Sequence, residues 1–420
     1  MNILLKAATI LDSDSDFHQK KVDIKISNGV IVQISDSISA DTSYKEISLE
    51  NVHISRGWFD SSVSFGEPGY EERETLENGL RVAALSGFSG IALQPNTHPV
   101  TDSNASIGFL KNSSRNHSVD LFPIGALTRI SKGKDLAELY DMKNAGAVAF
   151  GDYQKAIQNP NLLKIALQYA QGFHGLVLSF PQDAAIAGKG IVNEGKQSTL
   201  LGLKGIPELA EKLQITRDLF LLSYTGGKLH IPTISTAGSV ELIREAKRNG
   251  LAVSCSVSVH HLTLTDTLLD SFDTRYKVLP PLRTDKDIKV LLEGIKDGTI
   301  DMVTSDHQPI DIENKKIEFD NALYGTIGLE TAFGMLNNTI DTLLAIELLT
   351  KGKDIFGIKN AKIAEGEKAN LTLFNPEGTS IFSKKDVLSK SLNSAFFDQK
   401  MKGRVYGIIN NNQIVLKETI

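Results

Sequence analysis

The central part of this sequence alternates between short apolar runs and longer stretches with helical periodicity, and this alternation limits the possible folds more than any other feature. The short runs are rich in β-branched and aromatic residues, as strands are. Several of the longer stretches end in glycine, as at Asn249-Gly250 and Asp297-Gly298, where helices commonly stop. The predicted strands begin with one at residue 58 and continue at 90–94, 120–124, 147–150, 175–180, 228–234, 252–257 and 301–305; the predicted helices span 72–86, 135–144, 161–171, 206–222, 239–249 and 286–296.

Eight strands in alternation with helices predict an α/β protein with a parallel (β/α)₈ barrel, or TIM barrel. In this fold the binding and reacting groups lie at the C-terminal ends of the strands, because the loops that form the active site start there. The side chains at those strand ends are therefore the candidates for a functional site.

Both ends of the chain are β-like. Near the N-terminus, Asn28-Gly29 separates two β-branched runs and predicts a hairpin, and Asn410-Asn411-Asn412 marks a turn near the C-terminus. Neither end carries enough apolar residues for a core of its own. We therefore expect one small β-sandwich-like domain formed by both termini, residues 1–55 and 355–420, beside a barrel of residues 56–354.

Composition excludes several classes of function. The formal net charge of −5 gives no basic footprint for nucleic acid, and no stretch approaches the roughly 20 apolar residues that a membrane helix needs. The single cysteine, Cys255, allows no internal disulfide and suits a reducing compartment. The N-terminus does not have the pattern of a signal peptide. These features predict a soluble, cytoplasmic protein without a nucleic-acid or membrane partner.

The first predicted barrel strand and its turn read WFDSSVSFGEPG, from Trp58 to Gly69. This stretch resembles the first barrel strand of the dihydroorotases and other cyclic amidohydrolases, which carries Asp-x-His-x-His followed by Arg-Glu-Pro-Gly. Asp60 and the Glu-Pro-Gly at 67–69 match that pattern. The two histidines are replaced by Ser62 and Ser64, and the arginine by Gly66.

The resemblance extends over nearly the whole chain and includes several independent motifs in the family's order. QPNTHPV at 94–100 resembles its M-P-N-T-x-P-V, and LPPLR at 279–283 resembles its Asn-Pro-Pro-Leu-Arg. Further matches are GKGIVNEG at 188–195, the Gly-Leu-Glu-Thr that ends at 331, and GEKANLTL at 366–373. The chain is identified as a member of the dihydroorotase family within the amidohydrolases, with depleted metal ligands.

This resemblance implies a site that would hold two zinc ions, which lower the pKa of a bridging water and polarise the amide. In the family, four histidines and two acidic or modified residues bind the ions. The four histidine positions correspond here to Ser62, Ser64, Ser179 and Thr233, and a neutral hydroxyl is a poor zinc ligand beside imidazole or carboxylate. Two acids remain: Asp306, at the position of the family's general base, and Asp152, which replaces one of two adjacent family acids. We expect no bound metal or other cofactor, although zinc is the cofactor of the family.

The resemblance also implies that the pocket for the substrate carboxylate has changed. Of its family residues, Asn96 is retained, while the positions of an arginine and a histidine hold Gly66 and Ile310. Loss of the arginine removes a bidentate clamp for anions. Together with Leu279 and Phe180, Ile310 should make the pocket more apolar than that of its relatives.

The remaining histidines have a structural interpretation and a functional one. His230 should point away from Thr233, because the two are an odd number of residues apart on a strand, and it is expected to be packed. His260 and His261 are expected to be structural. Asp306 and His307 are the best remaining pair for acid–base chemistry, although scaffolding is the more frequent role for such a pair.

Three functions remain open. The leading hypothesis is a catalytically degenerate dihydroorotase-family protein of pyrimidine biosynthesis, a pseudoenzyme. The resemblance implies for it the role of a structural or regulatory partner of aspartate transcarbamoylase, and implies a homo-oligomer, since barrels of this family commonly dimerise. The first alternative is an active dihydroorotase that hydrolyses the cyclic amide of dihydroorotate. The second is a regulator that binds a small ligand in the emptied pocket.

Overall fold

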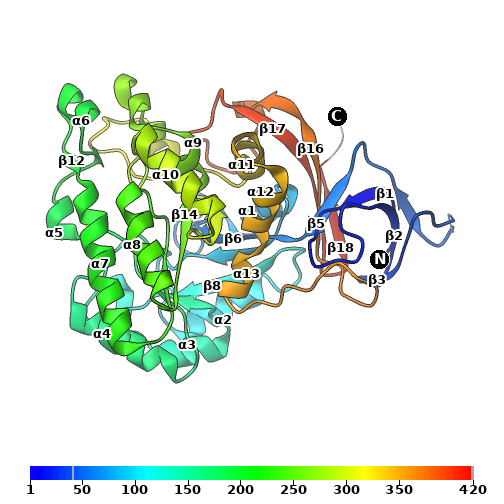
Figure 1. The fold of residues 1–420 in the computed structure, drawn as a ribbon, viewed down its shortest axis with the longest axis horizontal. Coiled ribbons are helices and arrows are strands. Elements are labelled where there is room, and N and C mark those ends of the chain that lie inside the picture. The colour runs from blue at the N-terminus through cyan, green and yellow to red at the C-terminus, as the bar shows by residue number, and fades with distance from the viewer. Residues whose placement is uncertain (40–41, 418–420) are drawn as a thin grey trace.

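The computed structural model describes residues 1–39 and 42–417, and eight parallel strands form its centre (Figure 1). Their order along the sheet is β15-β14-β13-β10-β9-β8-β7-β6. A parallel bridge between Val63 and His307 joins the two outer strands of this path, which a barrel requires. The strands are β6 (Trp58–Val63), β7 (Phe88–Leu93), β8 (Asp120–Gly125), β9 (Ala149–Phe150), β10 (Val177–Leu178), β13 (Leu229–Ile231), β14 (Val253–Ser258) and β15 (Met302–Thr304), and a separate pair is formed by β11 (Val192–Asn193) and β12 (Gly205–Ile206).

All eight predicted barrel strands are present, and the six predicted helices correspond to α1, α3, α4, α7, α8 and α10. The helix α2 was not predicted, because only Ile107 and Leu110 of its ten residues are buried and its apolar periodicity is weak. The helices are α1 (Leu76–Leu85), α2 (Asn104–Ser113), α3 (Leu139–Ala145), α4 (Pro160–Gln171), α5 (Ala184–Ala187), α6 (Lys196–Leu201), α7 (Glu208–Thr225), α8 (Ala237–Arg248), α9 (Val259–Thr263), α10 (Asp285–Lys296), α11 (Ala332–Thr339), α12 (Thr342–Thr350) and α13 (Gly352–Ile355).

Strands from both termini form a second body beside the barrel (Figure 1). They hydrogen-bond into one mixed sheet, not into two facing sheets as the β-sandwich-like prediction supposed. The reason is β5, which pairs parallel with β1 and antiparallel with β16 and so connects the two ends of the chain. The strands are β1 (Asn2–Ile10), β2 (Lys21–Ser27), β3 (Val30–Ser35), β4 (Lys45–Ile47), β5 (His53–Arg56), β16 (Leu371–Ile381), β17 (Lys400–Asn410) and β18 (Gln413–Leu416).

The two predicted turns of this sheet are confirmed. Asn28 and Gly29 both have positive φ, as a tight hairpin between right-twisted strands needs, and β2 pairs antiparallel with β3. Asn411 and Asn412 have φ of 50° and 57° between β17 and β18. The predicted domain boundaries at 55 and 355 stay predictions.

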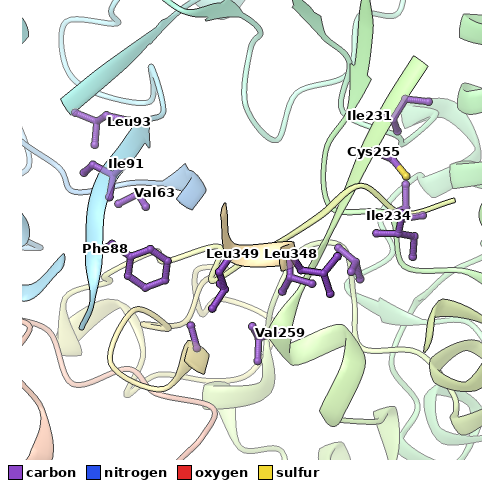
Figure 2. Packing of buried hydrophobic residues seen from close by; sticks show 14 of the residues in the cluster. Val63, Phe88, Ile91, Leu93, Ile231, Ile234, Cys255, Val259, Leu348 and Leu349 are labelled. Atoms are coloured by element: carbon purple, nitrogen blue, oxygen red, sulfur yellow. The ribbon is translucent and has the colours of Figure 1, made fainter. Parts of the chain in front are cut away.

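Two layers of apolar side chains surround the barrel strands. Inside the barrel, Phe59, Leu178, Met302 and Phe356 belong to one cluster. Between the strands and the outer helices lies a larger cluster that includes the buried Cys255, as predicted for that residue (Figure 2). None of the helices formed by the described residues is long and apolar enough to cross a membrane.

Candidate functional site

The C-terminal ends of β6, β7 and β15 meet in a buried polar cluster. The hydroxyl of Ser62 donates to Oδ1 of Asp306 at 2.8 Å, and Nε2 of Gln94 donates to the Ser62 oxygen at 3.2 Å. Asp306 follows β15 directly and has φ of 47°, which turns its side chain toward β6. We refer to Ser62, Gln94 and Asp306 as the strand-end cluster. The structure thus brings together two of the predicted site residues, Ser62 and Asp306.

The carboxyl group of Asp306 is strongly perturbed. Burial raises its pKa to about 7, against an ordinary 3.8; the hydrogen bond from Ser62 opposes this shift and the nearby Asp60 adds to it. Asp60 itself accepts hydrogen bonds from the amide of Ser305 at 2.9 Å and from the hydroxyl of Thr304. Asp60 therefore ties β6 to β15, in agreement with the structural role predicted for it.

A second hydrogen-bonded pair lies just beyond the C-terminal end of β6. Nδ2 of Asn96 donates to the oxygen of Ser64 at 2.8 Å, so the structure also brings these two predicted site residues together. Gly66 follows with φ of 151°, and a Cβ placed on it would lie 2.3 Å from the carbonyl oxygen of Tyr70. The turn as it stands therefore has no room for the arginine side chain of the family pattern.

At the end of β9, adjacent residues point in different directions. Asp152 accepts a hydrogen bond from the amide of Thr128 at 3.0 Å and another from its hydroxyl, and this contact directs its carboxylate away from the strand-end cluster. Tyr153, with φ of 56°, faces the cluster instead. Its hydroxyl is buried and has no hydrogen-bond partner within the described residues, and burial, with Asp306 nearby, raises the pKa of this hydroxyl. Sequence reasoning did not select Tyr153, and only its place beside Asp152 pointed to it.

Ser179 and Thr233 bond to residues other than Asp152 and Asp306. The hydroxyl of Ser179 donates to Asp218 of α7 at 2.6 Å, and Asp218 forms an ion pair with Arg217 at 2.8 Å. Thr233 has φ of 50°, and its amide donates to the hydroxyl of Ser256 at 3.2 Å. Asp218 is a site residue that sequence reasoning missed, because nothing in a helical pattern distinguishes a buried carboxylate from an exposed one.

The space that these strand ends enclose is small. A cavity of about 10 Å³ lies there, which is room for about one water molecule. Of the three residues expected to make the pocket apolar, Phe180 lines this cavity and packs with Leu279 in one apolar cluster, and Ile310 is buried. The cavity is lined by Ser62, Gln94, Tyr153, Gln154, Leu178, Phe180, Pro232 and Thr233.

The histidines near these strands are packed. The ring nitrogens of His230 lie 2.9 and 3.2 Å from the hydroxyls of Ser254 and Ser256, and burial lowers the His230 pKa to about 3. The ring of His307 accepts from the amide of Gly328 at 3.2 Å and does not bond to Asp306. Asp306 and His307 thus have different hydrogen-bond partners, and whether they act as an acid–base pair or as scaffolding stays a prediction.

His260 and His261 are also buried in the barrel wall. His261 lies 2.6 Å from the hydroxyl of Ser258 and 3.0 Å from the carbonyl oxygen of Pro280. The ring nitrogens of His260 have no hydrogen-bond partner within the part of the chain that the structure describes. Both histidines are buried, and the structural role expected for them stays a prediction.

A larger cavity, of about 530 Å³, lies at the opposite ends of the strands, beside the terminal sheet. Its buried Lys353 donates to the carbonyl oxygen of Gly57 at 2.6 Å, and burial lowers the Lys353 pKa to about 8. Arg56, also in its wall, is paired with Asp12 at 3.2 Å. The Lys353 bond connects α13 to the segment between β5 and β6, whereas the Arg56–Asp12 pair lies within the terminal sheet; the cavity is remote from the strand-end cluster.

Comparison with known proteins identifies the family. A protein-family model described as "Dihydro-orotase-like" matches residues 53–239. The chain is 38% identical over 427 residues to a dihydroorotase from Pelotomaculum thermopropionicum, with all of both chains covered. This chain belongs to the dihydroorotase family. It is also 36% identical over the full length of both chains to a dihydroorotase from Syntrophus aciditrophicus.

Solved structures show the same fold at greater distance. The L-hydantoinase (dihydropyrimidinase) from Arthrobacter aurescens superposes with a TM-score of 0.87 at 21% identity, over 99% of this chain and 96% of that one. A D-hydantoinase from Thermus sp. gives 0.81 at 19% identity, over 99% and 97%. These likenesses support a hydantoinase-like α/β fold with an added mixed sheet from both termini.

Because the chain belongs to this family, its strand-end side chains can be tested as ligands for zinc. Zinc sites in proteins are built from imidazole, thiolate and carboxylate ligands, usually four. Within residues 1–39 and 42–417, no three or more His, Cys, Asp or Glu side chains are grouped so that they could hold a metal ion. Asp152 and Asp306 are bonded to different hydroxyl residues, Thr128 and Ser62. This arrangement does not fit a pair of zinc ions.

Proposed function

We propose that this dihydroorotase-family protein of pyrimidine biosynthesis does not hydrolyse dihydroorotate, and that it serves as a structural or regulatory partner of aspartate transcarbamoylase. The proposal that hydrolysis is lost rests on how the former ligand positions are used. Ser62, Ser64 and Ser179 each form a hydrogen bond with a protein side chain, to Asp306, Asn96 and Asp218. These three hydrogen bonds hold the side chains at the strand ends in a closed arrangement.

Two further features support the loss of hydrolysis. The nucleophile of a binuclear amidohydrolase is a metal-bound hydroxide, so its chemistry depends on ligands that hydroxyl residues supply poorly. The turn at Gly66, moreover, has no room for the anion-binding arginine of the family pattern. Metal and substrate positions thus differ from the family together.

An active dihydroorotase is the second candidate function. It is favoured by the identity of 38% and 36% to dihydroorotases over the full length of this chain. Asp306, with a pKa raised to about 7, would be a base suited to neutral pH in that case. The small-ligand regulator has less support, because the cavity at the strand ends has room for about one water molecule.

The deciding experiment is hydrolysis of dihydroorotate by the purified protein, with and without added Zn²⁺, together with its metal content. The dihydroorotase of Pelotomaculum thermopropionicum serves as the positive control, and Asp306→Asn of this chain sets the background. We expect no turnover above that background and no stoichiometric zinc. Zinc-dependent turnover that is lost in Asp306→Asn would establish the active enzyme instead.

A further inference from the structure

The cavity of about 530 Å³ lies in the seam between the barrel and the terminal sheet, and we refer to it as the seam cavity. Asp120 and Phe122 of β8 line it from the barrel, and Lys368 and Asn370 line it from the segment that leads into β16. Residues 356–370, which follow α13, cross here from one body to the other (Figure 1). The volume is within the usual range for small-molecule sites, which are common at junctions between structural units.

The wall of the seam cavity is strongly basic. Two of its five cations are neutralised by neighbouring carboxylates, because Arg56 pairs with Asp12 at 3.2 Å and Lys359 pairs with Glu367 at 3.4 Å. Within the wall itself there is one carboxylate among the described residues. The charged side chains of the wall are Arg56, Lys111, Lys353, Lys359, Lys368 and Asp120.

The other three cations, Lys111, Lys353 and Lys368, form no ion pair within the part of the chain that the structure describes. Lys111 donates to the carbonyl oxygen of Leu121 at 3.1 Å, and Lys368 is exposed. Three lysines against the single carboxylate of Asp120 leave an excess of about two positive charges. A phosphate monoester carries the matching negative charge at pH 7.

Lys353 is the residue that most needs an anion. It is 3% exposed, and its ammonium group donates only to neutral acceptors. These are the carbonyl oxygen of Gly57 at 2.6 Å and the side-chain oxygens of Ser89 and Asn370, both at 3.4 Å. A buried lysine is ordinarily paired with an opposite charge, because an isolated charge is costly to remove from water. An anion in the seam cavity would supply that charge.

The rest of the wall suits the organic part of a ligand. Phe122, Val148 and Ile358 contribute apolar surface. Oδ1 of Asn360 is buried and accepts no hydrogen bond from the described residues, while Nδ2 of the same side chain donates to the carbonyl oxygen of Thr350 at 3.4 Å. A buried acceptor without a donor is costly, and a hydroxyl group of a ligand would satisfy it.

We propose that the seam cavity binds a sugar phosphate, either free or as part of a nucleotide, with its phosphate group among Lys111, Lys353 and Lys368 and a sugar hydroxyl at Asn360. The lysines act as point charges for the phosphate, which is a common role of lysine. The ligand contacts both the barrel and the terminal sheet and so stabilises their junction. The inference does not depend on whether the protein hydrolyses dihydroorotate, because the cavity lies at the opposite ends of the barrel strands.

Isothermal titration calorimetry with ribose 5-phosphate and with uridine 5′-monophosphate tests the site and distinguishes the two sources of the sugar phosphate. We expect one molecule of at least one of these probes to bind per chain, with an affinity that falls as the salt concentration rises. Ribose and inorganic phosphate should each bind at least about tenfold more weakly, because each makes only part of the contacts. Succinate, a dianion without a phosphate group, should also bind at least about tenfold more weakly.

Two substitutions test whether the lysines of the cavity hold the phosphate. Lys368→Glu changes an exposed side chain and should weaken binding about tenfold or more, because a charge-assisted contact is lost. Lys353→Met removes the buried cation and should weaken binding at least as much, with the melting curve of the free protein as a check on its folding. Lys132→Glu is the matched control, because Lys132 is exposed and lies beyond the C-terminal end of β8. It changes the net charge equally and should leave binding unchanged.

Proton uptake gives a second readout, which a nonspecific effect of charge would not produce. Burial lowers the Lys353 pKa to about 8; of the charged groups that face it, Asp120 and Asp354 raise this pKa and Arg56 lowers it. A bound phosphate raises the pKa as well, so binding at pH 8 should take up part of a proton. The phosphate itself, with a second pKa of about 6, is already ionised at that pH. Calorimetry in two buffers of different ionisation enthalpy measures the uptake, which Lys353→Met should abolish.

Three results would overturn the proposal. The first is that neither probe binds the unmodified chain with a Kd below about 1 mM. The second is that ribose, inorganic phosphate or succinate binds as tightly as the better probe, which would leave no recognition of a sugar phosphate. The third is that Lys368→Glu and Lys353→Met bind as tightly as the unmodified chain, or that binding at pH 8 takes up no proton, either of which would place the ligand elsewhere.

Discussion

The carboxyl group of Asp306 is enclosed by the strand-end cluster, and its titration should govern how stability depends on pH. Its pKa is raised by burial to about 7, so between about pH 4 and pH 7 the folded protein keeps a proton that the unfolded chain has lost. Stability from this group is therefore present at low pH and declines as the pH rises toward 7. Asp306→Asn removes this decline. We expect the variant to gain a few kcal/mol relative to the unmodified protein on going from pH 5 to pH 8, measured by urea unfolding at both pH values.

The control for this prediction is Asp16→Asn, because the Asp16 side chain is 85% exposed. Its effect on unfolding should be small and the same at both pH values. An equal effect of Asp306→Asn at pH 5 and pH 8 would contradict the raised pKa and the enclosure of the cluster.

Residue identities at the strand ends could be predicted from the sequence, but side-chain directions could not. The hydroxyl residues Ser62, Ser64, Ser179 and Thr233 could be read from the sequence, and the resemblance to the family placed them at the predicted ligand positions. The sequence did not show that the Asp152 side chain turns to Thr128. The positive φ of the next residue, Tyr153, decides which of the two side chains faces inward, and the sequence pattern does not predict that φ.

At the scale of elements, α7 supports the loop after β13 through Glu211. Its carboxylate accepts from the amides of Ser235 and Thr236 at 2.8 and 3.0 Å and from the hydroxyl of Ser239 at 2.6 Å, and it lies 3.6 Å from the buried Arg283. Glu211→Ala leaves that arginine without its partner. We expect a loss of about 3–5 kcal/mol in the first urea unfolding transition.

The same helix offers the control. Glu208 lies one turn earlier and pairs with Lys212 at the surface, where such a pair contributes only about 0.3–0.5 kcal/mol. Glu208→Ala should therefore change the transition little. Equal losses for the two variants would mean that the buried network does not stabilise the fold as the contacts imply.

Periodicity predicted the existence of the barrel elements better than it predicted their burial. The sequence does not reveal that the inward face of α7 is polar, because Glu and Asp, as at Glu211 and Asp218, are the residue types expected at exposed positions. The helix α2 was missed for a related reason, since its capping serine at 103 carries more information than its few apolar residues.

At the scale of the whole molecule, the sequence predicted one β domain formed by both termini, but it did not predict that the strands of this domain form a single mixed sheet. β5 pairs with β1, which is near it in the sequence, and with β16, whose residues are more than 300 positions away. The local sequence pattern carries no information about the second pairing. The fold superposes on the Arthrobacter aurescens hydantoinase with a TM-score of 0.87 at 21% identity. The architecture is thus retained over large sequence change.

The proposed role as a partner of aspartate transcarbamoylase leads to the last prediction. When the tagged chain is co-expressed with the aspartate transcarbamoylase of its own genome and purified under native conditions, we expect the transcarbamoylase to be recovered with it in fixed stoichiometry. Asp306→Asn should recover as much, because assembly does not require a base at the strand ends. The measurement is size-exclusion chromatography with light scattering, combined with transcarbamoylase activity in the fractions.

The two possible failures of that experiment lead to different conclusions. Recovery that is lost in Asp306→Asn would connect assembly to the strand-end cluster, and the partner would then be sensing that site. If no transcarbamoylase is recovered with either form, the chain is not its partner. If the purified protein also fails to hydrolyse dihydroorotate, the retained architecture would then need another binding partner.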